Sequence, residues 1–257
     1  MISAQSMQPA DGRIAVARRA RWPLIALLLV SGCGPRLTNP AVLEAPYPRE
    51  QLWAVAPFAN ESGASVVDSV AMTDTFAQEA HQVRGINTIP VNRVIKAMRT
   101  LQMDSVSTHG DALTLMNVLK LDALVVGTIT AYDPYRPMTL GMAVHLYARP
   151  APGPPHGMNP RALTRATSGH AAPGELGPPR PVAQAAGVFE AANHHTLKQL
   201  KAFASGRNEP DSAYGDDIYL VSMDLYAHFV CYRLLHDLFV EERTRLTPVA
   251  EQHQVAR

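Results

Sequence analysis

The fold is decided by residues 121–132, which read LDALVVGTITAY. Their first half is continuously apolar over residues 123–127, as expected for a central strand that is covered on both faces. From Thr128 onward apolar and polar residues alternate, which is typical of a strand with two different faces. This stretch is the strongest strand signal in the chain and predicts the centre of a sheet.

A second strand follows it closely. Residues 139–147 alternate again, and residues 133–137, which read DPYRP, form a turn between the two runs. We therefore predict an antiparallel hairpin with a slightly long loop. Aromatic and charged side chains are concentrated at this loop, which makes it either a solvated turn or a recognition edge for a partner protein or glycan. The candidate partner-binding residues are Tyr132, Asp133, Tyr135 and Arg136.

Upstream of this hairpin the sequence alternates between strand and helix signals. Residues 52–58 form a short apolar run that predicts a buried strand. The further elements predicted here are a helix over residues 66–83, a strand over residues 86–89, a helix that starts at Pro90, and a helix capped by Asp111.

Downstream we predict a strand over residues 182–191, a helix from Asn193 to about Ala204, and a long helix over residues 218–242 capped by Asp216 and Asp217. The apolar stripe of the long helix is wider than that of an ordinary surface helix. Its margin contacts the rest of its own domain, a partner subunit or a lipid surface. Together these elements predict an α/β fold, in which helices flank a mixed sheet.

Residues 150–181 interrupt the pattern, because they contain nine prolines and five glycines. Such a composition buries too little apolar area to offset the entropy of ordering. We predict a disordered insertion within a single domain that spans residues 51–242, followed by a polar tail over residues 243–257.

The amino terminus carries a targeting signal. Residues 27–33 read LLLVSGC, and they end a short apolar run that follows four arginines. A basic segment, about ten apolar residues and then small residues are typical of a secretory signal, and a cysteine directly after them matches a bacterial lipobox. We interpret residues 1–32 as a signal peptide, Cys33 as the acylated first residue of the mature protein, and residues 33–50 as a flexible tether. A plain secretory signal with an incidental cysteine is the alternative.

Composition excludes some classes of function. The formal net charge is +1 and no run of Lys or Arg appears, so the chain has no electrostatic reason to bind nucleic acid. The chain has two cysteines. If Cys33 carries lipid, Cys231 has no disulfide partner, and its apolar surroundings in the sequence predict a buried, inert thiol.

Motifs for enzymatic chemistry are missing from the sequence. His228 and His236 lie eight residues apart, and neither has a histidine four residues away, so they form no helical pair of histidines for a metal. No metalloprotease helix motif, paired-cysteine motif, nucleophile elbow or glycine-rich phosphate loop occurs. We therefore expect no metal, no catalytic residues and no cofactor other than the covalent lipid on Cys33.

Residues 55–63, which read VAPFANESG, resemble the first strand and turn of the CsgG/TolB-N/LpoB group of envelope proteins. The resemblance continues through residues 90–93 (PVNR) and 122–128 (DALVVGT) and covers about residues 51–148. It implies a domain like the anticodon-binding fold, held near the outer membrane by lipid. It also implies non-enzymatic work, either in building an export channel or in activating a cell-wall synthase by contact.

These observations lead to one functional hypothesis and one alternative. The hypothesis is a periplasmic lipoprotein, anchored in the outer membrane, that acts without catalysis as a protein-binding or assembly factor in envelope biogenesis or secretion. Its partners would be the membrane, through the lipid anchor, and envelope proteins or further copies of itself. The alternative is a periplasmic ligand-binding or enzymatic lipoprotein whose site is built from scattered residues.

Overall fold

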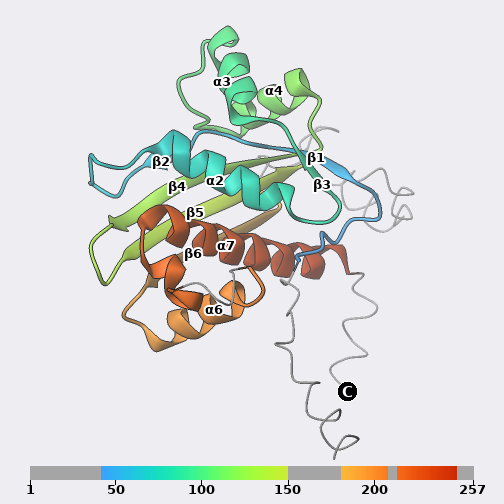
Figure 1. Ribbon diagram of the computed structural model, residues 1–257. Coiled ribbons are helices and arrows are strands. Elements are labelled where there is room, and N and C mark those ends of the chain that lie inside the picture. The colour runs from blue at the N-terminus through green and yellow to red at the C-terminus, as the bar shows by residue number, and fades with distance from the viewer. Residues whose placement is uncertain (1–41, 150–180, 208–212, 248–257) are drawn as a thin grey trace, which may run out of the picture. The chain divides into compact units, whose positions relative to one another are not determined.

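A mixed β-sheet forms the centre of the protein in the computed structural model, which describes residues 42–149, 181–207 and 213–247 (Figure 1). The strand order is β3-β1-β4-β5-β6, and the short β2 also pairs with β4. The predicted central strand is confirmed, since β4 lies in the middle of the sheet. The strands are β1 (Gln51–Val55), β2 (Ala59–Asn60), β3 (Ile86–Thr88), β4 (Ala123–Asp133), β5 (Thr139–Ala148) and β6 (Ala183–Glu190).

Strand direction changes across the sheet. β1 runs parallel to both β3 and β4, with Trp53 opposite Ala123. β4 and β5 form the predicted antiparallel hairpin, and β6 continues it antiparallel to β5. Because β1 and β4 start at the same end of the sheet, the β4–β5 loop lies at the opposite end.

Helices cover both faces of the sheet. The helices are α2 (Ser69–His81), α3 (Val91–Thr100), α4 (His109–Leu119), α6 (His194–Ala204) and α7 (Met223–Leu246), with a short 3-10 helix, η1 (Gly215–Leu220), before α7. On one face α2 and α7 lie side by side, and α3 and α4 pack against the other face (Figure 1). The α/β prediction is therefore confirmed.

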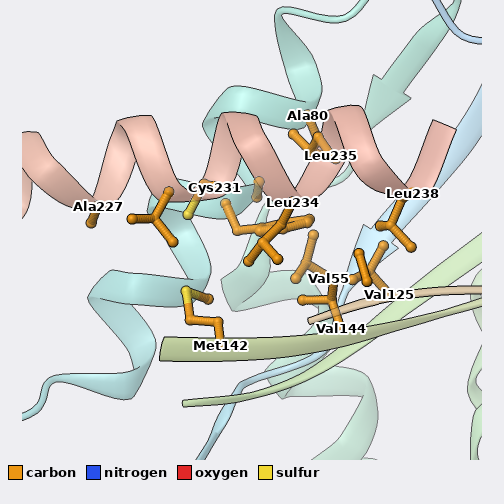
Figure 2. Packing of buried hydrophobic residues seen from close by; sticks show 14 of the residues in the cluster. Val55, Ala80, Val125, Met142, Val144, Ala227, Cys231, Leu234, Leu235 and Leu238 are labelled. Atoms are coloured by element: carbon orange, nitrogen blue, oxygen red, sulfur yellow. The ribbon is translucent and has the colours of Figure 1, made fainter. Parts of the chain in front are cut away.

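Alternate residues of the strands build two separate cores. In β1, Trp53 and Val55 face α2 and α7, whereas Ala54 faces α3 and α4. On the α7 side the apolar side chains of that helix point toward β1, β4 and β5, and Leu235 lies beside Ala80 of α2 (Figure 2). Most of the wide apolar stripe predicted for the long helix is thus buried against its own domain.

Helix starts follow capping chemistry, and two predicted caps are wrong. Asn193 caps α6 as predicted, accepting a hydrogen bond from the His195 amide at 2.8 Å. The helix assigned to Asp111 is capped instead by Thr108, with Asp111 at the third helical position of a capping box. The longest helix is capped by Ser222 and not by Asp216 and Asp217, which lie in η1.

Packed residues also lie on either side of the predicted range of residues 51–242. The packed chain begins before residue 51, because Ala45 is buried and its amide donates to the Arg84 carbonyl at 3.0 Å. At the other end α7 continues past residue 242 to Leu246. The predicted signal peptide, Cys33, almost all of the insertion at 150–181 and the last ten residues lie outside the described residues.

Candidate functional site

The β4–β5 loop and the end of β4 carry the four candidate partner-binding residues named from the sequence. Tyr135 projects from the loop with 80% of its surface exposed, and Asp133 and Arg136 are exposed as well. The Asp133 carboxylate accepts a hydrogen bond from the Tyr135 amide at 3.0 Å, which fixes the turn. The loop therefore presents an aromatic ring and two opposite charges to solvent.

Tyr132 lies apart from the other three candidates. Its ring is half-buried and packs against the core. Burial raises the pKa of its hydroxyl, and the negative charge of Asp224 at the start of α7 adds to the effect. The structure thus brings three of the four residues together at the surface. Their role in binding a partner stays a prediction.

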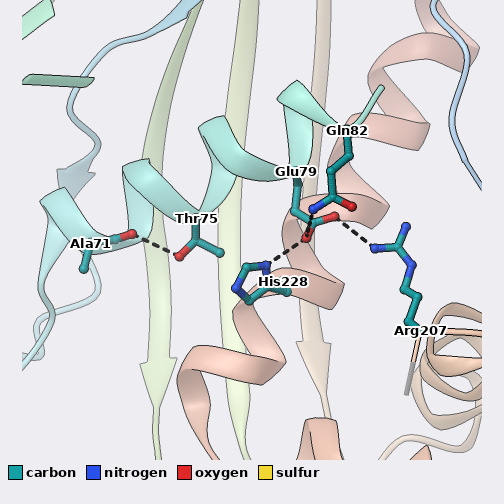
Figure 3. A network of polar contacts seen from close by, with 6 residues as sticks. All are labelled: Ala71, Thr75, Glu79, Gln82, Arg207 and His228. Carbon is teal, nitrogen blue, oxygen red and sulfur yellow. Dashed lines mark hydrogen bonds and ion pairs between the residues drawn. The ribbon is translucent and has the colours of Figure 1, made fainter. Parts of the chain in front are cut away.

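A polar network that the sequence did not reveal connects α2, α7 and the residues after α6 (Figure 3). At its centre is Glu79 of α2, whose side chain is 3% exposed. One carboxylate oxygen lies 2.8 Å from Nδ1 of His228, and the other lies 3.4 Å from Nη1 of Arg207. Residues 128 and 149 positions away from Glu79 in the chain therefore meet at one carboxylate.

Neighbouring apolar contacts hold this network in place. Phe76 and Ala80 on the same face of α2 are fully buried, so they fix Glu79 against α7. The Arg207 guanidinium lies over the rings of Phe203 and Tyr232, at 4.2 and 4.9 Å from their centroids. A buried carboxylate needs such partners, because an unpaired charge inside a protein is strongly unfavourable.

A depression opens beside the network, and its chemistry is limited. The described residues that line it are Glu79, Gln82, Phe203, Gly206, Arg207, Tyr219, Leu225 and His228. A carboxylate that orients an imidazole is part of many general-base systems. None of these lining residues has a serine, threonine or cysteine side chain to act as a nucleophile. The arrangement is suited to binding a small polar ligand or to locking α2 and α7 together.

A second buried carboxylate fastens the amino-terminal segment to the end of α7. Glu242 is fully buried and accepts hydrogen bonds from the Tyr47 hydroxyl at 3.0 Å and from Nη2 and Nε of Arg245 at 2.6 and 2.7 Å. Burial and the adjacent carboxylate raise the pKa of Tyr47, and the hydrogen bonds to Glu242 raise the pKa of Arg245. Nearby, Arg243 donates to the Glu44 carbonyl. The chain thus enters the domain at the end opposite the β4–β5 loop.

The other residues singled out by the sequence have simple surroundings. Cys231 is fully buried, and burial raises the pKa of its thiol well above the ordinary value, as expected for an inert cysteine. Within the described ranges, no cluster of three His, Cys, Asp or Glu side chains could hold a metal ion. In the same part of the chain, no helix combines the length and apolarity that crossing a membrane requires.

Comparisons with known proteins give weak structural likenesses. No protein-family model and no curated protein sequence matches the chain significantly. The fold is similar to a lipoprotein from Neisseria meningitidis, with 15% identity, a TM-score of 0.37, and coverage of 58% of this chain and 92% of that one. It is also similar to the LpoB C-terminal domain from Salmonella enterica, with 13% identity, a TM-score of 0.32, and coverage of 49% of this chain and 82% of that one. For LpoB from Escherichia coli the identity is 11%, the TM-score is 0.33, and the coverage is 57% of this chain and 73% of that one. At such TM-scores these likenesses carry no conclusion about function.

Proposed function

We propose that this chain is a lipoprotein, anchored in the outer membrane and facing the periplasm, that acts without catalysis by binding other envelope proteins. The observation that carries the proposal is the lipobox-like sequence over residues 27–33, which stands only nine residues before the first described residue, Val42. Nine residues reach at most about 30 Å. An acyl chain on Cys33 would therefore keep the domain close to the bilayer.

The geometry of the domain supports a division between an anchored end and a working end. The amino-terminal segment enters beside the last turns of α7, at the end of the sheet where β4 begins. β4 has eleven residues and spans about 36 Å. The β4–β5 loop, with Tyr135 at its tip, would thus face away from the attachment point and toward the periplasmic space.

Confinement to a membrane supports a function by contact. A tethered domain meets membrane-bound partners at a much higher effective concentration than a free one. Moderate affinity at an exposed loop is then sufficient for occupancy. This is how a domain with a small recognition loop could act as an assembly factor in envelope biogenesis or secretion.

Two variants of the full chain test the proposal. We expect Cys33→Ala to abolish acylation, as read by mass spectrometry of the amino-terminal peptide, and to move the protein from membranes to the soluble fraction. We expect a photo-crosslinking residue at position 135 to capture envelope proteins from intact cells. An unacylated wild-type protein that washes off membranes at low salt would refute the lipid anchor. The absence of crosslinked protein at position 135 would refute the loop as the binding site.

The depression beside Glu79 supports a second candidate, a ligand-binding lipoprotein. Its basis is the buried carboxylate that is shared by His228 and Arg207 next to an open, partly aromatic hollow. A small polar compound that raises the melting temperature of wild-type protein, but not of His228→Ala, would favour this candidate over the first.

A further inference from the structure

Several loops and helix ends meet at the end of the sheet that carries the β4–β5 loop, called here the loop end. β2 runs parallel to β4 beside Thr128 and Ile129 in the middle of that strand, so the β2–α2 connection leaves the sheet toward this end. α2 starts after that connection, at the cap Asp68. α7 starts there as well, because the charge of Asp224 acts on Tyr132. Figure 1 shows both helices beginning on the side of the hairpin loop.

Exposed apolar side chains are present at the loop end. Tyr135 is 80% exposed and Val66, in the β2–α2 connection, is 69% exposed. Val70 in the first turn of α2 and Val221 just before α7 are also exposed. Large apolar groups from three separate segments thus face solvent at one end of the domain, as at a protein-binding surface.

The charges at the loop end are mainly negative. Carboxylates lie at the ends of β4 and β6, at the starts of α2 and α7, in the β2–α2 connection and in η1, which leads into α7. They are Glu61, Asp68, Asp133, Glu190, Asp216, Asp217 and Asp224. Arg136 in the β4–β5 loop and the exposed Lys198 in α6, which starts directly after β6, are positive charges there. A surface that approaches this end therefore meets apolar groups within a negative field.

The opposite end of the domain is different, because its carboxylates are accompanied by arginines. Arg245 pairs with Glu242, and Arg243 donates to the carbonyl of Glu44. Arg149, at the end of β5, donates to the Leu121 carbonyl. Negative charge is thus displaced along the strands toward the loop end.

We propose that the loop end binds a protein surface on which exposed apolar side chains are surrounded by lysine and arginine. This inference rests on the proposed function and specifies the chemistry of the partner. Charge complementarity selects this occupant, because a negative field favours a basic surface and opposes both anionic lipid and the same end of a second copy. The apolar side chains supply the contact area, and the carboxylates supply orientation and rate of association.

The experiment uses the full acylated chain in permeabilised cells, with a photo-crosslinking residue at position 135. Asp216→Lys/Asp217→Lys reverses charge at the loop end, and Glu44→Lys/Glu50→Lys makes the same change of charge at the other end. All four side chains are exposed. Equal melting temperatures of the purified variants would show that the domain remains folded.

We expect the loop-end variant to lower the yield of the captured protein about tenfold, and the control variant to leave it within about twofold. Raising the salt from about 50 to about 300 mM should weaken wild-type capture similarly, because it shortens the screening length. The captured protein should crosslink through a patch rich in lysine and arginine. A crosslinking yield that changes neither with charge reversal nor with salt would overturn the inference and leave the loop as a binding site. Capture of only lipid or a second copy would do the same. Loss of all capture at position 135 would instead refute the loop as the binding site of the proposed function.

Discussion

Replacing Glu79 by glutamine tests whether the buried network holds α2 to α7. Glutamine has almost the same shape as glutamate, so the change removes the charge and leaves the volume of the site unchanged. The Glu79 side chain is 3% exposed and that of Arg207 is 14% exposed. The substitution therefore removes the negative charge that Arg207 and His228 both contact in a poorly solvated position.

The cost follows from these contacts. Losing one partner of a buried ion pair destabilises a protein by about 3–5 kcal/mol. The Arg207 contact is long, at 3.4 Å, and the guanidinium keeps its two aromatic neighbours, Phe203 and Tyr232. We therefore expect a loss of about 2–3 kcal/mol, at or below the lower end of that range. In a domain of this size that loss lowers the melting temperature by roughly 5–10 °C.

Thermal and urea unfolding, followed by circular dichroism, measure this loss. Asp74→Asn is the matched control, because Asp74 is an exposed carboxylate on the same helix. We expect that control to change stability by less than about 0.5 kcal/mol. If Glu79→Gln is as stable as the control, the network does not hold the helices together, and the reasoning from burial is refuted.

Three further predictions concern packing, acid stability and reactivity. Gly127→Ala should destabilise the domain by about 1–3 kcal/mol, because the new Cβ would lie 2.6 Å from the Phe58 ring, and adding Phe58→Leu should recover part of the loss in urea unfolding. Hydrogen bonds from Thr108 lower the pKa of Asp111. The ionised carboxylate therefore stabilises the fold at pH values above its ordinary pKa, and this stabilisation is lost as the pH falls through the lowered pKa. Asp111→Asn should therefore make the melting temperature depend less on pH below about pH 4. The same dependence in the variant and the wild type would contradict the role of Asp111 in the capping box. Burial should protect Cys231 from thiol reagents in the native state but not in urea, and rapid native labelling would show that the core opens readily.

Much of the fold could be predicted because strand and helix periodicity is local. The run over residues 123–127 and the alternation that follows it predicted β4, and Asn193 predicted the start of α6. The two wrong caps have local causes as well. Thr108 precedes Asp111 by three residues, which is the spacing of a capping box and could have been recognised. The second wrong assignment placed the cap on two aspartates and overlooked the serine at position 222.

The Glu79 network could not be predicted, because it joins side chains from distant parts of the chain. His228 lies 149 positions from Glu79, far beyond the spacing of any motif within one helix. One signal was available. Glu79 lies between Phe76 and Ala80 on the apolar face of its own helix, so a charged group was placed where only a paired one is tolerated. The identity of its partners required the fold.

The side of β6 that pairs with no described strand has a consequence for how the protein behaves when crowded. The Ala191 amide bonds to Met138 of the hairpin, so the amides of Gln184 and the alternate residues after it point away from the sheet. The Gln184 amide already donates a hydrogen bond to the Glu241 carboxylate of α7, at 2.6 Å. Glu190 places a second negative charge at the other end of β6. An incoming strand would have to displace the first carboxylate and approach the second. This side of the sheet is therefore a poor template for fibril growth, even at high local concentration.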